Sequence, residues 1–173
     1  MNIPLRWSTV DGACIVELSP VVLEHAIRLA DELHPLENGA SLYGRYSSDQ
    51  RAAFIVGLAP VSRDATRGRF HFRRGVAGLA AFFRRLFRQT KGESYYVGEF
   101  HSHPGGAANP SADDDATQYA IAADDDSQCQ APVLIIVGGV PGDRTLGVFV
   151  HTRARRRFVL RGGNRKAPSE ENT

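Results

Sequence analysis

Two histidines separated by one residue, His101 and His103, carry the strongest chemical signal in the chain. On an extended segment alternate side chains point to the same side, so both imidazoles can reach one metal ion. Asp114 follows after a short loop and can supply an oxygen ligand. Two nitrogens and one oxygen leave the fourth position of a tetrahedral zinc open for water, as in catalytic zinc sites. The pattern therefore predicts one Zn²⁺ per chain.

Two further acidic residues, Asp113 and Asp115, flank Asp114 and could also supply the oxygen ligand. All three fall in the first turn of a helix expected over residues 112–123, where the helix dipole favours acidic side chains. Ser111 directly precedes this helix and is a suitable N-cap. Residue type alone does not choose among the three carboxylates.

The residues around the histidines match a longer signature. Residues 98–104 read Gly-Glu-Phe-His-Ser-His-Pro, Ser111 follows His103 after seven residues, and Asp114 follows Ser111 after two. This run resembles the signature of the JAMM (JAB/MPN) metallopeptidases, His-x-His, seven residues, Ser, two residues, Asp. The Glu before the aromatic residue is similar to the prokaryotic branch of that family. Within this resemblance, the spacing selects Asp114 as the third zinc ligand.

An upstream segment strengthens the resemblance. Residues 37–44 read Glu-Asn-Gly-Ala-Ser-Leu-Tyr-Gly and are similar to the family's Glu-x-Gly-Gly-x-Leu-x-Gly segment, with Ala40 in place of the second Gly. Gly39 and Gly44 fit a backbone that must turn or approach another segment closely. With both motifs in the family's order, the resemblance extends over most of residues 13–160.

The resemblance implies a role for each remaining site residue. Glu37 would be the general base that takes a proton from the zinc-bound water and returns it to the leaving amine. Ser111 would donate a hydrogen bond to the oxyanion of the tetrahedral intermediate. Glu99 is the alternative to Glu37, because a regular strand puts it on the same face as His101. It could equally be a partner of a ligand imidazole.

Hydrophobic periodicity predicts a mixed α/β (α+β) domain, with Ser19 able to cap the first helix. The resemblance implies a curved mixed β-sheet flanked by helices, the cytidine-deaminase-like architecture, with the zinc at the edge of the strand that carries the His pair. The expected strands are 14–18, 42–46, 52–58, 70–72, 95–103, 133–137, 146–151 and 158–160, and the expected helices are 20–34, 76–87 and 112–123.

The chain is expected to hold one domain, residues 1–161, followed by a mobile polar tail, residues 162–173. Residues 160–163 read Leu-Arg-Gly-Gly, the same four residues that end ubiquitin. Chance in an Arg-rich strand is the preferred interpretation. The alternative is a tail that occupies the product channel and inhibits the enzyme.

Composition excludes several classes of function. The formal net charge of +2 and a charged content of 23% do not indicate a nucleic-acid-binding protein. Arginines cluster at 73–74, 84–85 and 153–157. A solvated face is the preferred interpretation of these clusters, and a patch that docks an acidic partner protein is the alternative.

The two cysteines, Cys14 and Cys129, lack Cys-x-x-Cys spacing and are expected to be buried, free thiols in a reducing compartment. Residues 1–10 contain no basic segment followed by an apolar run, so no signal peptide is predicted. No apolar stretch approaches the roughly 20 residues that span a bilayer. A cytoplasmic protein without membrane contact is expected.

The resemblance implies a zinc-dependent isopeptidase or peptidase that cleaves after the C-terminus of ubiquitin or a ubiquitin-like protein. Its partners would be the modifier, its conjugates and the activating and conjugating enzymes of a bacterial antiviral operon. One alternative is a peptidase that processes a sulfur-carrier protein. The other is a metal-free MPN scaffold, which the presence of His101, His103 and Asp114 disfavours. The His-Glu-x-x-His string of other zinc peptidases is absent.

Overall fold

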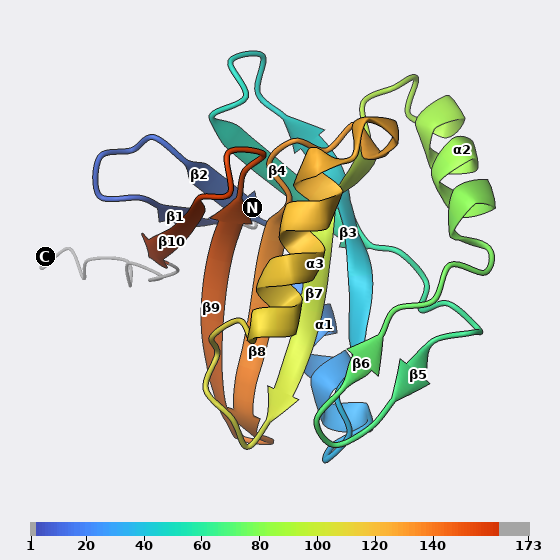
Figure 1. Cartoon of the computed structure of the whole chain (residues 1–173), viewed down its shortest axis with the longest axis vertical. Coiled ribbons are helices and arrows are strands. Elements are labelled where there is room, and N and C mark those ends of the chain that lie inside the picture. The colour runs from blue at the N-terminus through green and yellow to red at the C-terminus, as the bar shows by residue number, and fades with distance from the viewer. Residues whose placement is uncertain (1–2, 163–173) are drawn as a thin grey trace, which may run out of the picture.

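The computed structural model describes residues 3–162 as a curved mixed sheet with helices packed on it, which confirms the expected α/β (α+β) fold (Figure 1). The strands are β1 (Leu5–Ser8), β2 (Ile15–Leu18), β3 (Gly39–Tyr46), β4 (Ala52–Leu58), β5 (Thr66–Arg67), β6 (Phe72–Arg73), β7 (Tyr95–Pro104), β8 (Val133–Val140), β9 (Asp143–His151) and β10 (Arg157–Gly162). The helices are α1 (Pro20–Glu32), α2 (Leu79–Gln89), α3 (Ala112–Ala123) and a 3₁₀ turn, η1 (Asp125–Ser127).

The sheet curls until its ends meet. Its strand order is β1-β10-β9-β8-β7-β3-β4-β2, and β1 pairs with both β10 and β2, so the sheet closes into a barrel. The pairs β7–β8 and β2–β4 are parallel, and the other pairs in the barrel are antiparallel. The short hairpin β5–β6 forms a separate two-stranded sheet near the start of β3 (Figure 1). The ring of its Phe72 contacts His101 on β7.

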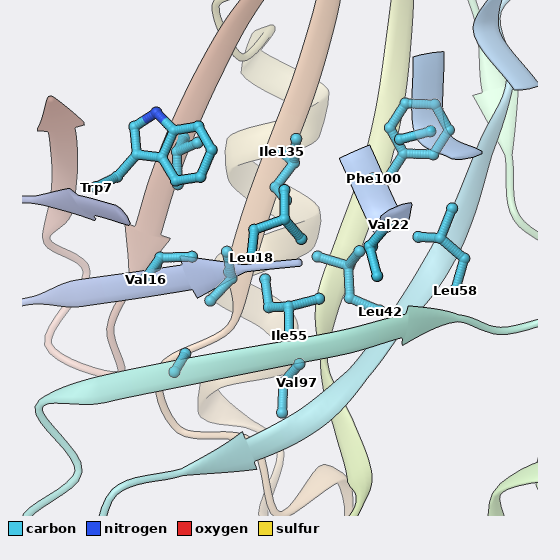
Figure 2. Close-up of a cluster of buried hydrophobic side chains, with 14 of the residues drawn as sticks. Trp7, Val16, Leu18, Val22, Leu42, Ile55, Leu58, Val97, Phe100 and Ile135 are labelled. Carbon is cyan, nitrogen blue, oxygen red and sulfur yellow. The ribbon is translucent and has the colours of Figure 1, made fainter. Parts of the chain in front are cut away.

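The main core lies between the barrel strands and α1. Its largest members include Trp7, Leu18, Ile55 and Phe100 (Figure 2). The predicted central strand at 133–137 is confirmed as part of β8, and its unbroken apolar run has a physical reason. Alternate residues of β8 enter the main core, while the residues between them form a second cluster on the outer face. A strand buried on both faces needs no polar alternation.

Most predicted elements are present, with shifted ends. The predicted helix 76–87 begins only at Leu79, because Gly78 has a φ of 83° and interrupts helical backbone. The predicted cap of the first helix is wrong: Ser19 occupies the N-cap position but its side chain makes no capping hydrogen bond. Strand β1 was not predicted, because its four residues are held by pairing with distant β2 and β10 rather than by a local pattern.

The chain's two cysteines are free, with Cys129 buried and Cys14 partly buried. Gly162 ends β10 and pairs with Trp7, and Leu160 is buried, so most of the Leu-Arg-Gly-Gly string forms part of the barrel. The rest of the string and of the expected tail, residues 163–173, lies outside the described residues. No helix within residues 3–162 is long and apolar enough to cross a membrane.

Arg144 on β9 ties α1 to the barrel. Its side chain is 6% exposed. Its guanidinium donates to Asp31 at 2.6 and 2.8 Å, to the carbonyl of Ala30 at 3.2 Å and to the carbonyl of Gly139 at 2.5 Å. Arg144→Met is therefore expected to lower the free energy of unfolding by about 1–3 kcal/mol, because it leaves the carbonyl of buried Ala30 and the partly exposed Asp31 carboxylate without this donor. Urea unfolding, monitored by circular dichroism, measures the free energy of unfolding of the wild type and the variant.

Arg28→Met is the matched control. Arg28 pairs with Glu32 at 3.7 Å, but both side chains are more than half exposed. Such a pair is worth only about 0.3–0.5 kcal/mol. Equal losses for Arg144→Met and Arg28→Met would contradict the anchoring role of Arg144.

Candidate metal centre

The pairing of β3 with β7 brings the two halves of the predicted site together. Gly39 at the start of β3 stands opposite His101 on β7. Asn38 and Ser102 then lock the register, because the Asn38 N–H donates to Ser102 Oγ and the Ser102 N–H donates to the Asn38 carbonyl, each at 2.8 Å. Glu37 is thereby held beside the His-Ser-His run.

The predicted need for glycine at positions 39 and 44 is confirmed. A Cβ on Gly39 would lie 2.5 Å from both the Phe100 carbonyl oxygen and a ring carbon of Phe72. A Cβ on Gly44 would lie 1.9 Å from the Phe54 carbonyl oxygen. Both distances are far below van der Waals contact, so any larger residue would push β3 away from its neighbours.

Helix α3 begins with a capping box that orients Asp114. The Asp114 N–H donates to Ser111 Oγ at 3.1 Å, and Asp114 Oδ2 accepts from the Ser111 N–H at 2.8 Å and from its hydroxyl at 2.7 Å. From this position Asp114 contacts both histidines. Its Oδ1 lies 2.7 Å from His101 Nδ1 and its Oδ2 lies 3.2 Å from His103 Nε2.

The acidic neighbours of Asp114 point elsewhere. Asp115 pairs with His151 at 2.8 Å and with Arg157 at 2.6 Å, on the side of α3 that faces β9 and β10. Asp113 is exposed at the rim of the site. Of the three carboxylates, Asp114 is the one that contacts both imidazoles.

All five predicted site residues line one open cleft of about 580 Å³: Glu37, His101, His103, Ser111 and Asp114. A second cleft of about 940 Å³ adjoins it and shares His101 and Asp114 as well as His71 and Phe72 of the β5–β6 hairpin. The two clefts therefore meet at the His101–Asp114 pair.

The Glu37 carboxyl is placed to exchange protons. Partial burial raises the pKa of Glu37 above its ordinary value, the opposing effect of nearby His103 being smaller. Its side chain takes part in none of the hydrogen bonds or ion pairs among the described residues. A carboxylate with a raised pKa and no fixed partner can accept a proton and release it again.

The His101–Asp114 pair is strongly coupled. Burial lowers the pKa of His101, but hydrogen bonds to Asp114 and Glu99 outweigh it and raise the pKa to about 9. Burial likewise opposes the charge on Asp114, yet hydrogen bonds from His101 and His103 hold its pKa well below the usual range. Metal binding requires a neutral imidazole, so it would release a proton from His101.

The donor set fits a zinc ion, although the residues as placed contact one another directly. Among residues 3–162, no three His, Cys, Asp or Glu side chains surround a common point at ligand distance. Tetrahedral zinc with bonds of about 2.0–2.2 Å keeps its donor atoms roughly 3.4 Å apart. The N–O distances of 2.7 Å from His101 to Asp114 and 3.2 Å from His103 to Asp114 are both shorter than this spacing.

Both carboxylate oxygens of Glu99 have partners, and one partner is Arg74, which the sequence did not assign to the site. Glu99 is 3% exposed, lies 3.3 Å from His101 Nε2 and pairs with Arg74 Nη1 at 2.5 Å. Arg74 belongs to a cluster interpreted as a solvated face, and for Arg74 that interpretation is wrong. It lies in an irregular segment, so no periodicity in the sequence could have shown which way it points.

Comparison with known families and proteins points to one group. The family described as prokaryotic homologs of the JAB domain matches residues 19–154. The CD-NTase/cGAS isopeptidase of Enterobacter hormaechei subsp. hoffmannii is 43% identical over 126 residues, which cover 72% of this chain and 68% of that protein. The probable metalloprotease y4qB of Sinorhizobium fredii is 27% identical over 140 residues, covering 80% and 85% of the two chains.

A solved structure shows the same fold. The solution structure of protein DSY2949 from Desulfitobacterium hafniense superposes with a TM-score of 0.54 and covers 83% of this chain and 86% of that one. Its sequence identity is 18%, so the likeness concerns the fold alone.

Proposed function

The chain belongs to the family of prokaryotic homologues of the JAB domain, and from this premise we propose that it is a zinc-dependent isopeptidase. Together with the isopeptidase and metalloprotease names of its relatives, family membership makes the chain a JAB-type hydrolase of peptide or isopeptide bonds. The observation that carries the zinc mechanism is the convergence of His101, His103, Asp114 and Glu37 on one cleft.

Each residue has a stated part in the reaction. His101, His103 and Asp114 would hold the metal, and a bound Zn²⁺ supplies Lewis-acid chemistry and a water with a pKa of about 7. Glu37 accepts a proton from the attacking water and delivers it to the nitrogen of the leaving amine. Ser111 turns its hydroxyl from Asp114 toward the developing oxyanion and donates a hydrogen bond to it.

The proposed substrate is an isopeptide or peptide bond after the C-terminus of a ubiquitin-like protein, cleaved during deconjugation or precursor processing. Partners would be the conjugates of that modifier and the activating and conjugating enzymes of a bacterial antiviral operon. The two adjoining clefts that share His101 and Asp114 offer room for a polypeptide substrate, which supports this proposal. The name of the 43% identical relative favours a second candidate, a bond that joins a CD-NTase to its target.

Metal removal tests the mechanism. The purified protein should contain about one zinc per chain, and it should cleave ubiquitin–reporter or CD-NTase–reporter fusions in a way that 1,10-phenanthroline abolishes and added Zn²⁺ restores. Iodoacetamide should leave cleavage unchanged, because neither Cys14 nor Cys129 lines the clefts. Cleavage of the fusion after chelation and after alkylation is measured by mass spectrometry of the products.

The outcomes separate the alternatives. Cleavage that survives chelation but is lost on alkylation would refute the zinc mechanism. Zinc-free protein without activity would indicate a scaffold. Cleavage of a sulfur-carrier fusion alone would assign the chain to sulfur-carrier processing.

A further inference from the structure

We propose that Arg74 is a positioning residue of the metal centre, which acts through the buried carboxylate of Glu99 to hold the His101 imidazole in its ligating orientation. This inference rests on the proposed function, because it assigns His101 as a metal ligand. It differs from that proposal in concerning a residue outside both sequence motifs.

Glu99 is surrounded by four polar partners. Its Oε1 lies 2.5 Å from Arg74 Nη1 and accepts from the Tyr96 hydroxyl at 3.3 Å. Its Oε2 lies 3.3 Å from His101 Nε2 and accepts from Gln118 Nε2 at 3.4 Å. A carboxylate that is 3% exposed is costly unless a cation and hydrogen bonds compensate it. Arg74 is the arginine that supplies this charge.

The His101 ring is fixed from three directions. Nδ1 faces Asp114 at 2.7 Å and Nε2 faces Glu99 at 3.3 Å. The ring of Phe72 meets the imidazole edge-on, with the centroids 5.4 Å apart. A carboxylate on the second nitrogen of a ligand histidine sets both its tautomer and its orientation, so Glu99 can do this for His101 only while it stays in place.

Arg74 is itself well anchored. Its side chain is 30% exposed, its Nη1 donates to Ser41 Oγ at 3.3 Å, and its guanidinium lies 5.7 Å from the centre of the Tyr96 ring. It directly follows β6, whose hairpin partner strand leads into Gly68. The carbonyl of Gly68 accepts the N–H of Glu37 at 2.8 Å. One segment therefore contacts both the metal-ligand half and the Glu37 half of the site.

The test measures zinc affinity in competition with a chelating dye, without substrate. Arg74→Met is expected to weaken zinc binding about 10- to 100-fold, the usual effect of losing an outer partner of a ligand. Arg73→Met is the matched control, because Arg73 is exposed and takes part in none of the ion pairs of residues 3–162. The visible spectrum of the Co²⁺-loaded protein should shift for Arg74→Met and stay unchanged for Arg73→Met.

A double-mutant cycle tests whether Arg74 acts through Glu99. In a Glu99→Gln background, Arg74→Met should have no further effect on zinc affinity, because the link is already broken. Effects that multiply would overturn the proposal, as would an unchanged affinity in Arg74→Met or an equal loss in Arg73→Met. If Arg74→Met does not fold, Arg74→Lys replaces it in the test. Arg74→Lys is expected to lower zinc affinity, but by less than Glu99→Gln does. Wild-type zinc affinity in Arg74→Lys would contradict the proposal.

The inference and the proposed function can fail separately. Normal zinc binding with a confirmed cycle but no amide cleavage would leave the role of Arg74 intact and refute the isopeptidase. Zinc-dependent cleavage, together with a zinc affinity that Arg74→Met does not change, would support the isopeptidase and refute the role of Arg74.

Discussion

Replacing Glu37 with Gln is expected to lower kcat about 10²- to 10⁴-fold, the usual contribution of a general acid–base. Glutamine has the same shape but cannot take a proton from the attacking water. The zinc content should stay at the wild-type value, because Glu37 contacts none of the proposed ligands among the described residues. Turnover of the fusion substrate and metal analysis of the same preparation measure the two effects.

Glu99→Gln is the decisive comparison for Glu37→Gln. Glu99 is enclosed by Arg74 and His101, so its loss should weaken zinc affinity and should leave the zinc-saturated turnover within about 10-fold of wild type. If Glu99→Gln removes turnover at full zinc occupancy while Glu37→Gln does not, Glu99 is the base. Glu32→Gln, an exposed change on α1, controls for the loss of a carboxylate.

His103→Ala is expected to raise the zinc dissociation constant by more than about 10²-fold, because it removes a ligand rather than an outer partner. His103 is the better test of the two histidines. Its side chain is 16% exposed, against 11% for His101. Among residues 3–162 its imidazole pairs with Asp114 but not with Glu99, whereas that of His101 pairs with both, so truncation of His103 disturbs less of the surrounding structure. Dye competition gives the affinity, and thermal unfolding of the zinc-free protein checks the fold.

His71→Ala is the matched control for His103→Ala. His71 lines the same cleft but is exposed, so its truncation should leave zinc affinity within about twofold of wild type. Comparable losses for the two variants would mean that the cleft binds zinc through a different set of histidines.

The sequence predicted well those parts of the site that depend on neighbours in the chain. Strand alternation predicted that His101, His103 and Glu99 share one face of β7. In the structure Glu99 contacts His101, and His103 contacts Asp114. The N-cap of α3 was predicted from Ser111 and is confirmed, because a cap involves residues only three positions apart; the reciprocal bond from the Ser111 N–H to Asp114 was not predicted. The apolar run of β8 was equally clear, since its side chains alone indicate burial.

The rest of the site required contacts between distant segments. Only the family resemblance gave Glu37 a role, because no pattern among its neighbours in the chain marks it. In the structure the β3–β7 register, locked by Asn38 and Ser102, holds it beside the histidines. Strand register depends on which side chains fill the core, and a one-residue slip would reverse every side chain.

By itself, the sequence determined the residue types of the proposed ligands, their local spacing and most of the helices and strands that carry them. Only the tertiary structure decided that Asp115 turns away to His151 and Arg157 and that β1 closes the barrel. It also decided that Arg74, although its side chain is 30% exposed, pairs with the buried Glu99. The physical reason is the same in each case. The partner of each charge or strand edge lies far away in the sequence, and a local pattern of residues cannot indicate a partner at that distance.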